Sequence, residues 1–284
     1  IRDRSTTRLA SDIPATGRTA DGTAFDFSGP DGAPVMVLIH GLGLCRRLWD
    51  DHLPALAAGH RVLRYDLYGH GDSAPPPLSG ALCGVSLTVY ADQLARLLDY
   101  LDIASAVIVG FSIGGMINRR FAMDYPGRAA ALVILNSPHD RGPQAQEQVE
   151  ARAAAVRDEG RMATMDAALD RWFTPDFRQE TPSVMRLVRE WREIVDPESY
   201  AAAAAVLAHG VRELVRPHPP ISCLTLVVTC ENDTGSTPSM SRAICNEIDG
   251  SEVQIIGRLQ HLGLIEDPAA FIGPILTFFE RTKT

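Results

Sequence analysis

The stretch Val107-Ile108-Val109-Gly110-Phe111-Ser112-Ile113-Gly114-Gly115 combines a strand, a tight turn and the start of a helix. Its β-branched run has the length and composition of a buried strand. The run passes directly into Gly110 to Gly114, which fits the pattern G-x-S-x-G. Apolar residues then recur at helical spacing, at Met116, Ile117, Phe121 and Met123. Strand, turn and helix in this order are the context expected of a nucleophile elbow.

The two glycines of this turn have a steric purpose. A chain that turns from strand to helix at one residue forces that residue, Ser112, into a strained conformation, so the residues two positions away must be small. Gly110 and Gly114 meet this requirement. The Ser112 hydroxyl would stand at the carboxyl edge of the sheet, and the Ile113 N–H would point toward a developing oxyanion. Taken alone, the pentapeptide also fits an ordinary glycine-rich turn, so the rest of the chain must decide.

The bulk composition limits the classes of protein. A chain of 284 residues, 45% hydrophobic and 22% charged, predicts a soluble globular protein with an ample core. The net charge of -8 argues against general binding to nucleic acid or anionic membranes. No apolar run reaches the roughly 20 residues of a membrane span, and residues 1–7 lack the apolar core of an export signal. The five cysteines lack metal-binding spacing and predict reduced thiols in a cytoplasmic protein.

Predicted strands alternate with predicted helices along most of the chain. We expect an antiparallel edge strand at 24–27 and further strands at 35–39, 60–66, 107–109, 131–135, 224–228 and 252–256. Helical spacing appears at 53–58, 87–101, 240–248 and 268–279, and directly after the elbow. This alternation predicts a parallel, doubly wound sheet with helices on both faces.

One segment departs from this alternation. Residues 144–216 contain no convincing strand, and Ala-rich and Arg/Glu-rich helical segments are interrupted at Pro175, Pro182 and Pro197. We interpret residues 140–216 as an inserted helical lid. Residues 1–139 and 217–284 would then form the core.

A second glycine-rich turn follows the predicted strand at 35–39. His40-Gly41-Leu42-Gly43 begins where that strand ends. An oxyanion site needs a second N–H donor opposite the one after the nucleophile, and the Leu42 N–H is the candidate. An ordinary glycine turn is the alternative. His40 itself is interpreted as a structural hydrogen-bonding residue.

Two polar residues complete a catalytic constellation. A serine is a weak nucleophile until a base takes its proton, and that base needs a third group to fix its tautomer. Asp233 and His261 each follow a late strand, on loops that a doubly wound sheet gathers at its carboxyl edge. The order Ser112, Asp233, His261 is the one found in α/β-hydrolases. A loop aspartate and a loop histidine are each unremarkable alone, but their order and positions together point to a triad.

From Phe25 to Phe279 the chain resembles the α/β-hydrolase family. The likeness rests on the elbow, on His40-Gly41, on Tyr65-Asp66 with residues 69–73, and on the surroundings of Asp233 and His261. Some relatives place the acid one strand earlier, near Asn136, but an amide cannot serve as the acid. Within the family the chain is most similar to the 3-oxoadipate enol-lactonase group, through the lid segment 171–177.

Three positions depart from the pattern of these relatives. Cys230 stands where a glycine is usual, Gly235 is an extra residue in the acid loop, and Gln260 precedes the histidine in place of glycine or serine. These changes alter the acid and base loops, and they put the identity of the substrate in doubt more than the triad.

The resemblance implies acyl transfer to water through Ser112, His261 and Asp233, with the Leu42 and Ile113 N–H groups as the oxyanion hole. It implies no metal and no organic cofactor. The expected partner is a small carboxylate-bearing lactone, ester or enamide. Arg171 is a candidate for binding the carboxylate, with solvated surface arginine as its alternative role. Trp172 is a candidate pocket wall, or simply part of the lid core.

Other functions stay open on the same fold. A carbon–carbon bond hydrolase, a cofactor-free lyase or haloperoxidase, and a non-catalytic ligand receptor would each be compatible with these residues. A haloalkane dehalogenase is disfavoured because its nucleophile is an aspartate where this chain has Ser112. A dinucleotide-binding protein is disfavoured because neither glycine-rich turn fits G-x-G-x-x-G. The sequence leaves open whether the chain forms a homo-oligomer.

Overall fold

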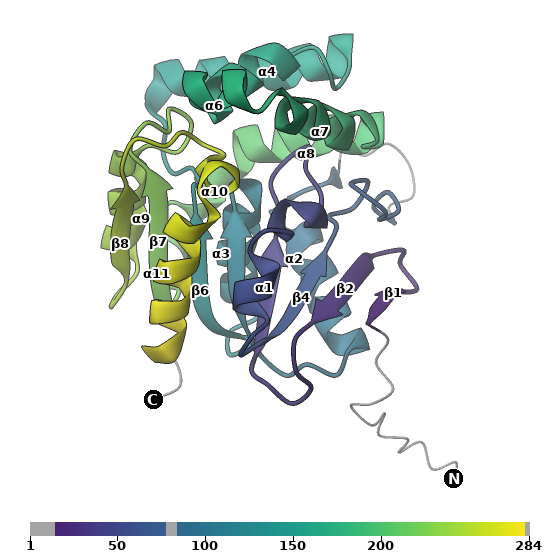
Figure 1. The fold of residues 1–284 in the computed structure, drawn as a ribbon, viewed down its shortest axis with the longest axis vertical. Coiled ribbons are helices and arrows are strands. Elements are labelled where there is room, and N and C mark those ends of the chain that lie inside the picture. The colour runs from purple at the N-terminus through teal and green to yellow at the C-terminus, as the bar shows by residue number, and fades with distance from the viewer. Residues whose placement is uncertain (1–14, 78–83, 282–284) are drawn as a thin grey trace.

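The computed structural model describes residues 15–77 and 84–281, and Cys83 lies outside these ranges. Eight strands form one sheet in the order β1-β2-β4-β3-β5-β6-β7-β8 (Figure 1). The strands are β1 (Thr16–Arg18), β2 (Ala24–Ser28), β3 (Val35–Ile39), β4 (Arg61–Tyr65), β5 (Ala106–Phe111), β6 (Ala129–Leu135), β7 (Leu224–Cys230) and β8 (Glu252–Ile256). Strands β3 to β8 are parallel to one another, which confirms the predicted, mostly parallel sheet.

The outer part of the sheet differs from the prediction. Strand β2 pairs antiparallel with β4, as expected, but β1 pairs with its other edge, so β2 is not the edge strand. Strand β1 has three residues, with Gly17 opposite Phe25. Three residues are too few to show an alternating pattern, which explains why this strand was not predicted.

Strand β5 shows how the sheet separates two apolar layers. Ile108 faces a cluster that contains side chains of α2 (Leu87–Tyr100), α3 (Ile113–Asp124) and α9 (Pro238–Glu247). Val107 and Val109 face a second cluster, with side chains of α1 (Leu53–Leu56) and α11 (Pro268–Arg281). Successive strand residues point to opposite faces, so an apolar run is buried on both sides. The predicted doubly wound sheet is therefore confirmed.

A helical layer lies over the carboxyl ends of the strands (Figure 1). It consists of α4 (Gly142–Glu159), α5 (Met165–Trp172), α6 (Pro175–Glu180), α7 (Pro182–Glu193) and α8 (Pro197–His209). Residues 136–223, all of which the structure describes, contain no strand. The three prolines predicted as breaks are the first residues of α6, α7 and α8, where a missing N–H costs nothing.

The strand order changes direction around β3. Its neighbours are β4 on one side and β5 on the other. At such a switch point the loops after the two central strands diverge and leave a crevice. The Leu42 loop follows β3 and Ser112 follows β5, so the fold brings both to this crevice.

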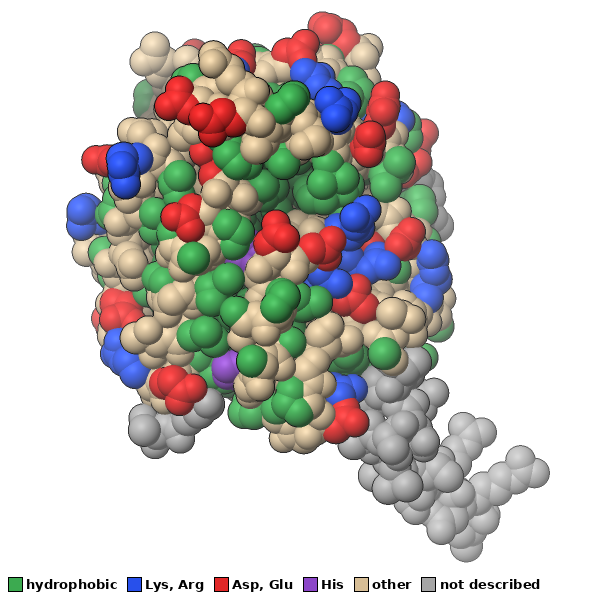
Figure 2. All heavy atoms as spheres, in the orientation of Figure 1, with side chains coloured by type: hydrophobic (Ala, Val, Ile, Leu, Met, Phe, Trp, Pro, Cys, Tyr) green, Lys and Arg blue, Asp and Glu red, His purple; other side chains and the backbone are tan. Residues whose placement is uncertain are grey.

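Two short helices refine the expected pattern. The predicted helix at 53–58 is only α1, preceded by a 3₁₀ turn over Arg46–Trp49. The four-residue α10 (Gly263–Glu266) follows His261 and was not predicted. No helix among the described residues is long and apolar enough to cross a membrane. On the face drawn in Figure 2, acidic and basic side chains are interspersed.

Three buried histidines are neutral in the folded protein at neutral pH. Burial lowers the pKa of His40 and of His52 to about 4, and that of His70 to about 3. In an unfolded chain each would titrate near its ordinary value of about 6.5. The unfolded state therefore binds more protons between these values. The stability that these histidines contribute is complete above about pH 6.5 and is lost as the pH falls toward 4.

His52 allows this effect to be isolated, because it packs against Trp49 and neither ring nitrogen has a partner among the described residues. We expect His52→Phe to weaken the fall in unfolding free energy between about pH 7 and about pH 4.5, by on the order of 2 kcal/mol. Urea unfolding of both proteins at both pH values measures this difference. An identical fall in both proteins would contradict the account.

Candidate active site

The turn after β5 has the strained geometry that its glycines predict. Ser112 has φ 57° and ψ -115° at the start of α3. A Cβ on Gly110 would lie 2.2 Å from the carbonyl oxygen of Gly114, and one on Gly114 would lie 2.6 Å from the carbonyl oxygen of Ile39. Neither position accepts a larger residue without movement of the backbone. The packing of β5 against α3 and β3 thus holds the serine in its unusual conformation.

The structure brings Ser112, His261 and Asp233 together. Nε2 of His261 lies 3.2 Å from Oγ of Ser112, and Nδ1 of the same ring lies 2.7 Å from Oδ2 of Asp233. With Nδ1 donating to the carboxylate, Nε2 is free to accept a proton from the serine hydroxyl. The Asp233 side chain has no exposed surface and that of His261 is 12% exposed. The arrangement has the geometry of an activated serine nucleophile.

Four hydrogen bonds fix the Asp233 carboxylate. Oδ1 accepts from the backbone N–H groups of Gly235 and Ser236, each at 2.9 Å. Oδ2 accepts from His261 and from Nδ2 of Asn136, which is 2.8 Å away. Asn136 is not the acid, as expected of an amide, but its hydrogen bond to the acid was not predicted. Asn136 directly follows β6, which pairs with β7, the strand that leads to Asp233. This position could have indicated that the two side chains lie close together.

Two backbone N–H groups near Ser112 are the predicted candidates for an oxyanion hole. Ile113 is the first residue of α3, so its N–H has no acceptor inside the helix. Leu42 lies in the neighbouring turn and lines the same pocket as Ser112. His40 holds this turn, because its Nδ1 bonds the Gly41 carbonyl oxygen at 2.8 Å and its Nε2 accepts from the Leu67 N–H at 3.0 Å. His40 therefore has the structural position that the sequence predicted.

The two cysteines nearest the site are buried thiols. Burial is the main cause that raises the pKa of Cys45 and of Cys230 to about 12, with Asp66 adding to the shift at Cys45. Both are therefore protonated at neutral pH and poor nucleophiles. Among the described residues no group of three or more His, Cys, Asp or Glu side chains is placed to hold a metal ion.

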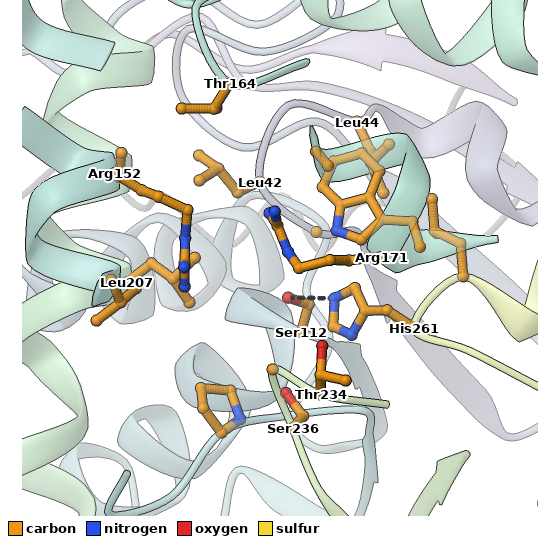
Figure 3. A pocket seen from close by; sticks show the side chains of 18 of the residues that line it. Leu42, Leu44, Ser112, Arg152, Thr164, Arg171, Leu207, Thr234, Ser236 and His261 are labelled. Atoms are coloured by element: carbon orange, nitrogen blue, oxygen red, sulfur yellow. Dashed lines mark hydrogen bonds between the residues drawn. The ribbon is translucent and has the colours of Figure 1, made fainter. Parts of the chain in front are cut away.

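A pocket with about 930 Å³ of space, including its mouth, lies between the strand ends and the helical layer. Its floor contains Ser112, His261, Thr234 and Ser236 (Figure 3). Its apolar wall includes Leu42, Leu44, Phe111, Val149, Val156 and Leu207. Four arginines also line it, namely Arg141, Arg152, Arg171 and Arg192. The pocket combines an apolar wall with converging polar groups, as sites for small organic molecules do, and it is strongly basic.

Both predicted lid residues lie in this pocket. Arg171 and Trp172 line it, and Arg171 points into it above Ser112 (Figure 3). The Trp172 ring centre lies 6.3 Å from that of the His261 ring. The backbone carbonyl oxygen of Trp172 accepts from the Leu262 N–H at 2.8 Å. Glu266 accepts from the N–H and the hydroxyl of Thr174, at 2.8 and 2.6 Å. Residues 172–174 of the helical layer are thus hydrogen-bonded directly to the segment that follows His261.

The other three arginines were missed by the sequence analysis. On α4, Val149, Arg152, Ala153 and Val156 all line the pocket. Their spacing of three and four residues places them on one face of the helix. An arginine at an otherwise apolar face was a signal that could have been found. Arg141 and Arg192 carry no such pattern, and only the packed structure brings them to the pocket.

Comparison with known proteins identifies the family of this fold. The model of the family described as "Alpha/beta hydrolase family" matches residues 36–273. The chain is 28% identical over 256 residues to 3-oxoadipate enol-lactonase 2 of Acinetobacter baylyi, covering 89% of this chain and 92% of that protein. It is 25% identical to (E)-2-((N-methylformamido)methylene)succinate hydrolase of the same organism, covering 92% and 95%. The enol-lactonase structure from Burkholderia xenovorans LB400 superimposes with a TM-score of 0.81 at 28% identity, covering 91% and 96%.

The Asn136 contact can be tested by removing its amide. We expect Asn136→Ala to lower kcat for any ester substrate about tenfold, because a hydrogen bond to a charged group is worth about 1.5–3 kcal/mol. Asn246→Ala, which removes an exposed amide on α9, is the matched control and should leave kcat unchanged. If both variants retain the kcat of the wild type, Asn136 does not position the acid.

Proposed function

The chain belongs to the α/β-hydrolase family, and we propose that it is a serine hydrolase that cleaves a small carboxylate-bearing lactone, ester or enamide through an acyl-enzyme. The observation that carries the proposal is the bridging position of His261, within hydrogen-bond distance of both Ser112 and Asp233 on the floor of a pocket. A ligand receptor would need the pocket but would have no need of this arrangement.

The first half of the proposed reaction acylates the serine. Oγ of Ser112 attacks the substrate carbonyl carbon while its proton passes to Nε2 of His261. Asp233 accepts from Nδ1 and stabilises the imidazolium that forms. The negative charge on the carbonyl oxygen is stabilised by the N–H groups of Leu42 and Ile113. The intermediate then collapses, the bond to the leaving oxygen or nitrogen breaks, and His261 returns its proton to that atom.

The second half releases the acyl group to water. A water molecule gives a proton to Nε2 of His261 as its oxygen attacks the acyl-enzyme carbonyl. Collapse of the second intermediate breaks the bond to Oγ of Ser112, which takes the proton back from His261. The net reaction adds one water to the substrate. In a lactone the leaving oxygen stays attached to the acyl chain, so a single ring-opened product results.

Two observations support an anionic substrate. Arg171 points into the pocket above Ser112, and guanidinium groups bind carboxylates through paired hydrogen bonds (Figure 3). The similar proteins of A. baylyi are named for the hydrolysis of an enol-lactone and of a substituted succinate. We therefore infer a small-molecule partner rather than a nucleic acid or a membrane. The cytoplasmic location stays a prediction from the cysteine pattern.

The nucleophile is tested by a neutral ester such as p-nitrophenyl acetate. We expect the wild type to hydrolyse it and Ser112→Ala to lose at least about 1000-fold in kcat/KM, since nucleophile and base act as one unit. Ser183→Ala, at an exposed position of α7, is the control and should keep the rate of the wild type. Equal rates in wild type and Ser112→Ala would refute a serine mechanism.

The role of Arg171 is tested by comparing two esters that differ in one carboxylate. For Arg171→Gln we expect kcat/KM to fall about tenfold more for mono-p-nitrophenyl glutarate than for p-nitrophenyl valerate, which has a methyl group in place of the carboxylate, mainly through KM. A specific loss on the charged ester follows if Arg171 binds the carboxylate. Equal losses on both esters would show that Arg171 only supports the lid.

A further inference from the structure

The pocket carries more positive charge than one carboxylate needs. Four arginines line it, and in the part of the chain that the structure describes none of them forms an ion pair with a carboxylate. Among the described residues that line the pocket only Asp233 carries a carboxylate, which is buried and accepts hydrogen bonds from His261, Asn136 and two backbone N–H groups. The charge in the pocket is therefore not compensated by the acidic side chains around it.

Repulsion between the positive charges of the four arginines lowers the pKa of several of them. After burial, the next cause that lowers the pKa of Arg152 is the charge of Arg171, and Arg171 likewise acts on Arg192. The charge of Arg152 acts on Arg141, where the exposed Asp140 offsets it only in part. Like charges that repel one another in a partly buried pocket lower the stability of the folded protein unless a counter-charge binds there. The arrangement is suited to an anionic ligand.

Arg192 gives the strongest sign of an unmet partner. The residue is only 2% exposed, and its Nε and Nη1 atoms have no hydrogen-bond partner among the described residues. Its guanidinium lies over the rings of Trp172 and Tyr200, at 4.9 and 5.3 Å from their centres. Aromatic faces attract the cation but cannot accept its N–H groups as a carboxylate would. The buried cation of Arg192 therefore has no counter-charge among the described residues.

The arginines come from two sides of the pocket. Arg152 lies on α4 and Arg141 directly precedes this helix. Arg171 lies on α5 and Arg192 on α7. Figure 3 shows Arg152 and Arg171 entering the pocket from different helices. Arg141 donates to the Leu207 carbonyl oxygen at 3.0 Å, and Arg171 donates to the Ala167 carbonyl oxygen at 2.7 Å. Each pair thus contains a guanidinium held in place by a backbone oxygen.

We propose that the pocket has two anion subsites, one formed by Arg171 and Arg192 and the other by Arg141 and Arg152, and that the substrate carries two carboxylates. This inference rests on the proposed function, because it describes the substrate of the same Ser112 site. One carboxylate would compensate one pair of arginines and leave the other pair exposed to its own repulsion. A dicarboxylate compensates both, with its reacting carbonyl over Ser112.

The test measures binding without turnover. In Ser112→Ala protein, isothermal titration calorimetry compares glutarate with valerate, which has the same chain length and one carboxylate. We expect glutarate to bind at least about tenfold more tightly, a difference of about 1.4 kcal/mol. Inorganic phosphate, a compact dianion that cannot reach both subsites, should bind no better than valerate. Equal binding of glutarate with either valerate or phosphate would overturn the proposal.

Variants of the second subsite locate the effect. With Arg152→Gln or Arg141→Gln added to Ser112→Ala, we expect glutarate to lose its tenfold advantage over valerate. Arg157→Gln is the matched control, because Arg157 lies on the same helix, is exposed and pairs with Asp158. It should keep the advantage. If the advantage survives in both Arg152→Gln and Arg141→Gln, the second subsite does not exist.

The two proposals fail separately. If glutarate shows no advantage while the wild type hydrolyses p-nitrophenyl acetate through Ser112, the two-subsite inference is wrong and the serine hydrolase stands. If glutarate is preferred as described but no serine-dependent hydrolysis occurs, the pocket binds dicarboxylates and the proposed reaction is wrong.

Discussion

The strained backbone at Ser112 is the constraint on which the site depends. The turn is held because β5 lies between β3 and β6 and because Gly110 and Gly114 let α3 start against them. Its direction places the serine hydroxyl and the Ile113 N–H at the same edge of the sheet. Asn136, Asp233 and His261 are arranged around that point, and each follows the end of a parallel strand.

The helical layer covers the carboxyl edge of the sheet and contributes four positively charged arginines to the pocket. The four arginines that line the pocket have no carboxylate partners among the described residues, an arrangement that lowers stability and that an anionic ligand would relieve. The helical layer is also hydrogen-bonded to the segment after His261, through Trp172 to Leu262 and through Thr174 to Glu266. These contacts fix the position of the helical layer relative to the loop that carries His261.

Much of the fold and the site could be predicted because their signals are local. A buried strand before G-x-S-x-G, and a strand before each of Asp233 and His261, can be recognised in short windows of sequence. The arginine cluster could not be predicted this way, because its members belong to three helices or their ends, between residues 141 and 192, and come together only when α4, α5 and α7 pack. The bond from Asn136 to Asp233 joins residues 97 positions apart. Strand β1 was missed because three residues carry no periodicity.

The most direct test of an activated serine is the intact mass of the protein after reaction with a small fluorophosphonate. We expect one stoichiometric adduct, located on Ser112 by peptide mapping and absent in Ser112→Ala. Such an adduct requires both a nucleophile deprotonated by its base and N–H groups that hold the phosphonyl oxygen. An unmodified wild type, or an adduct that persists in Ser112→Ala, would contradict the central claim.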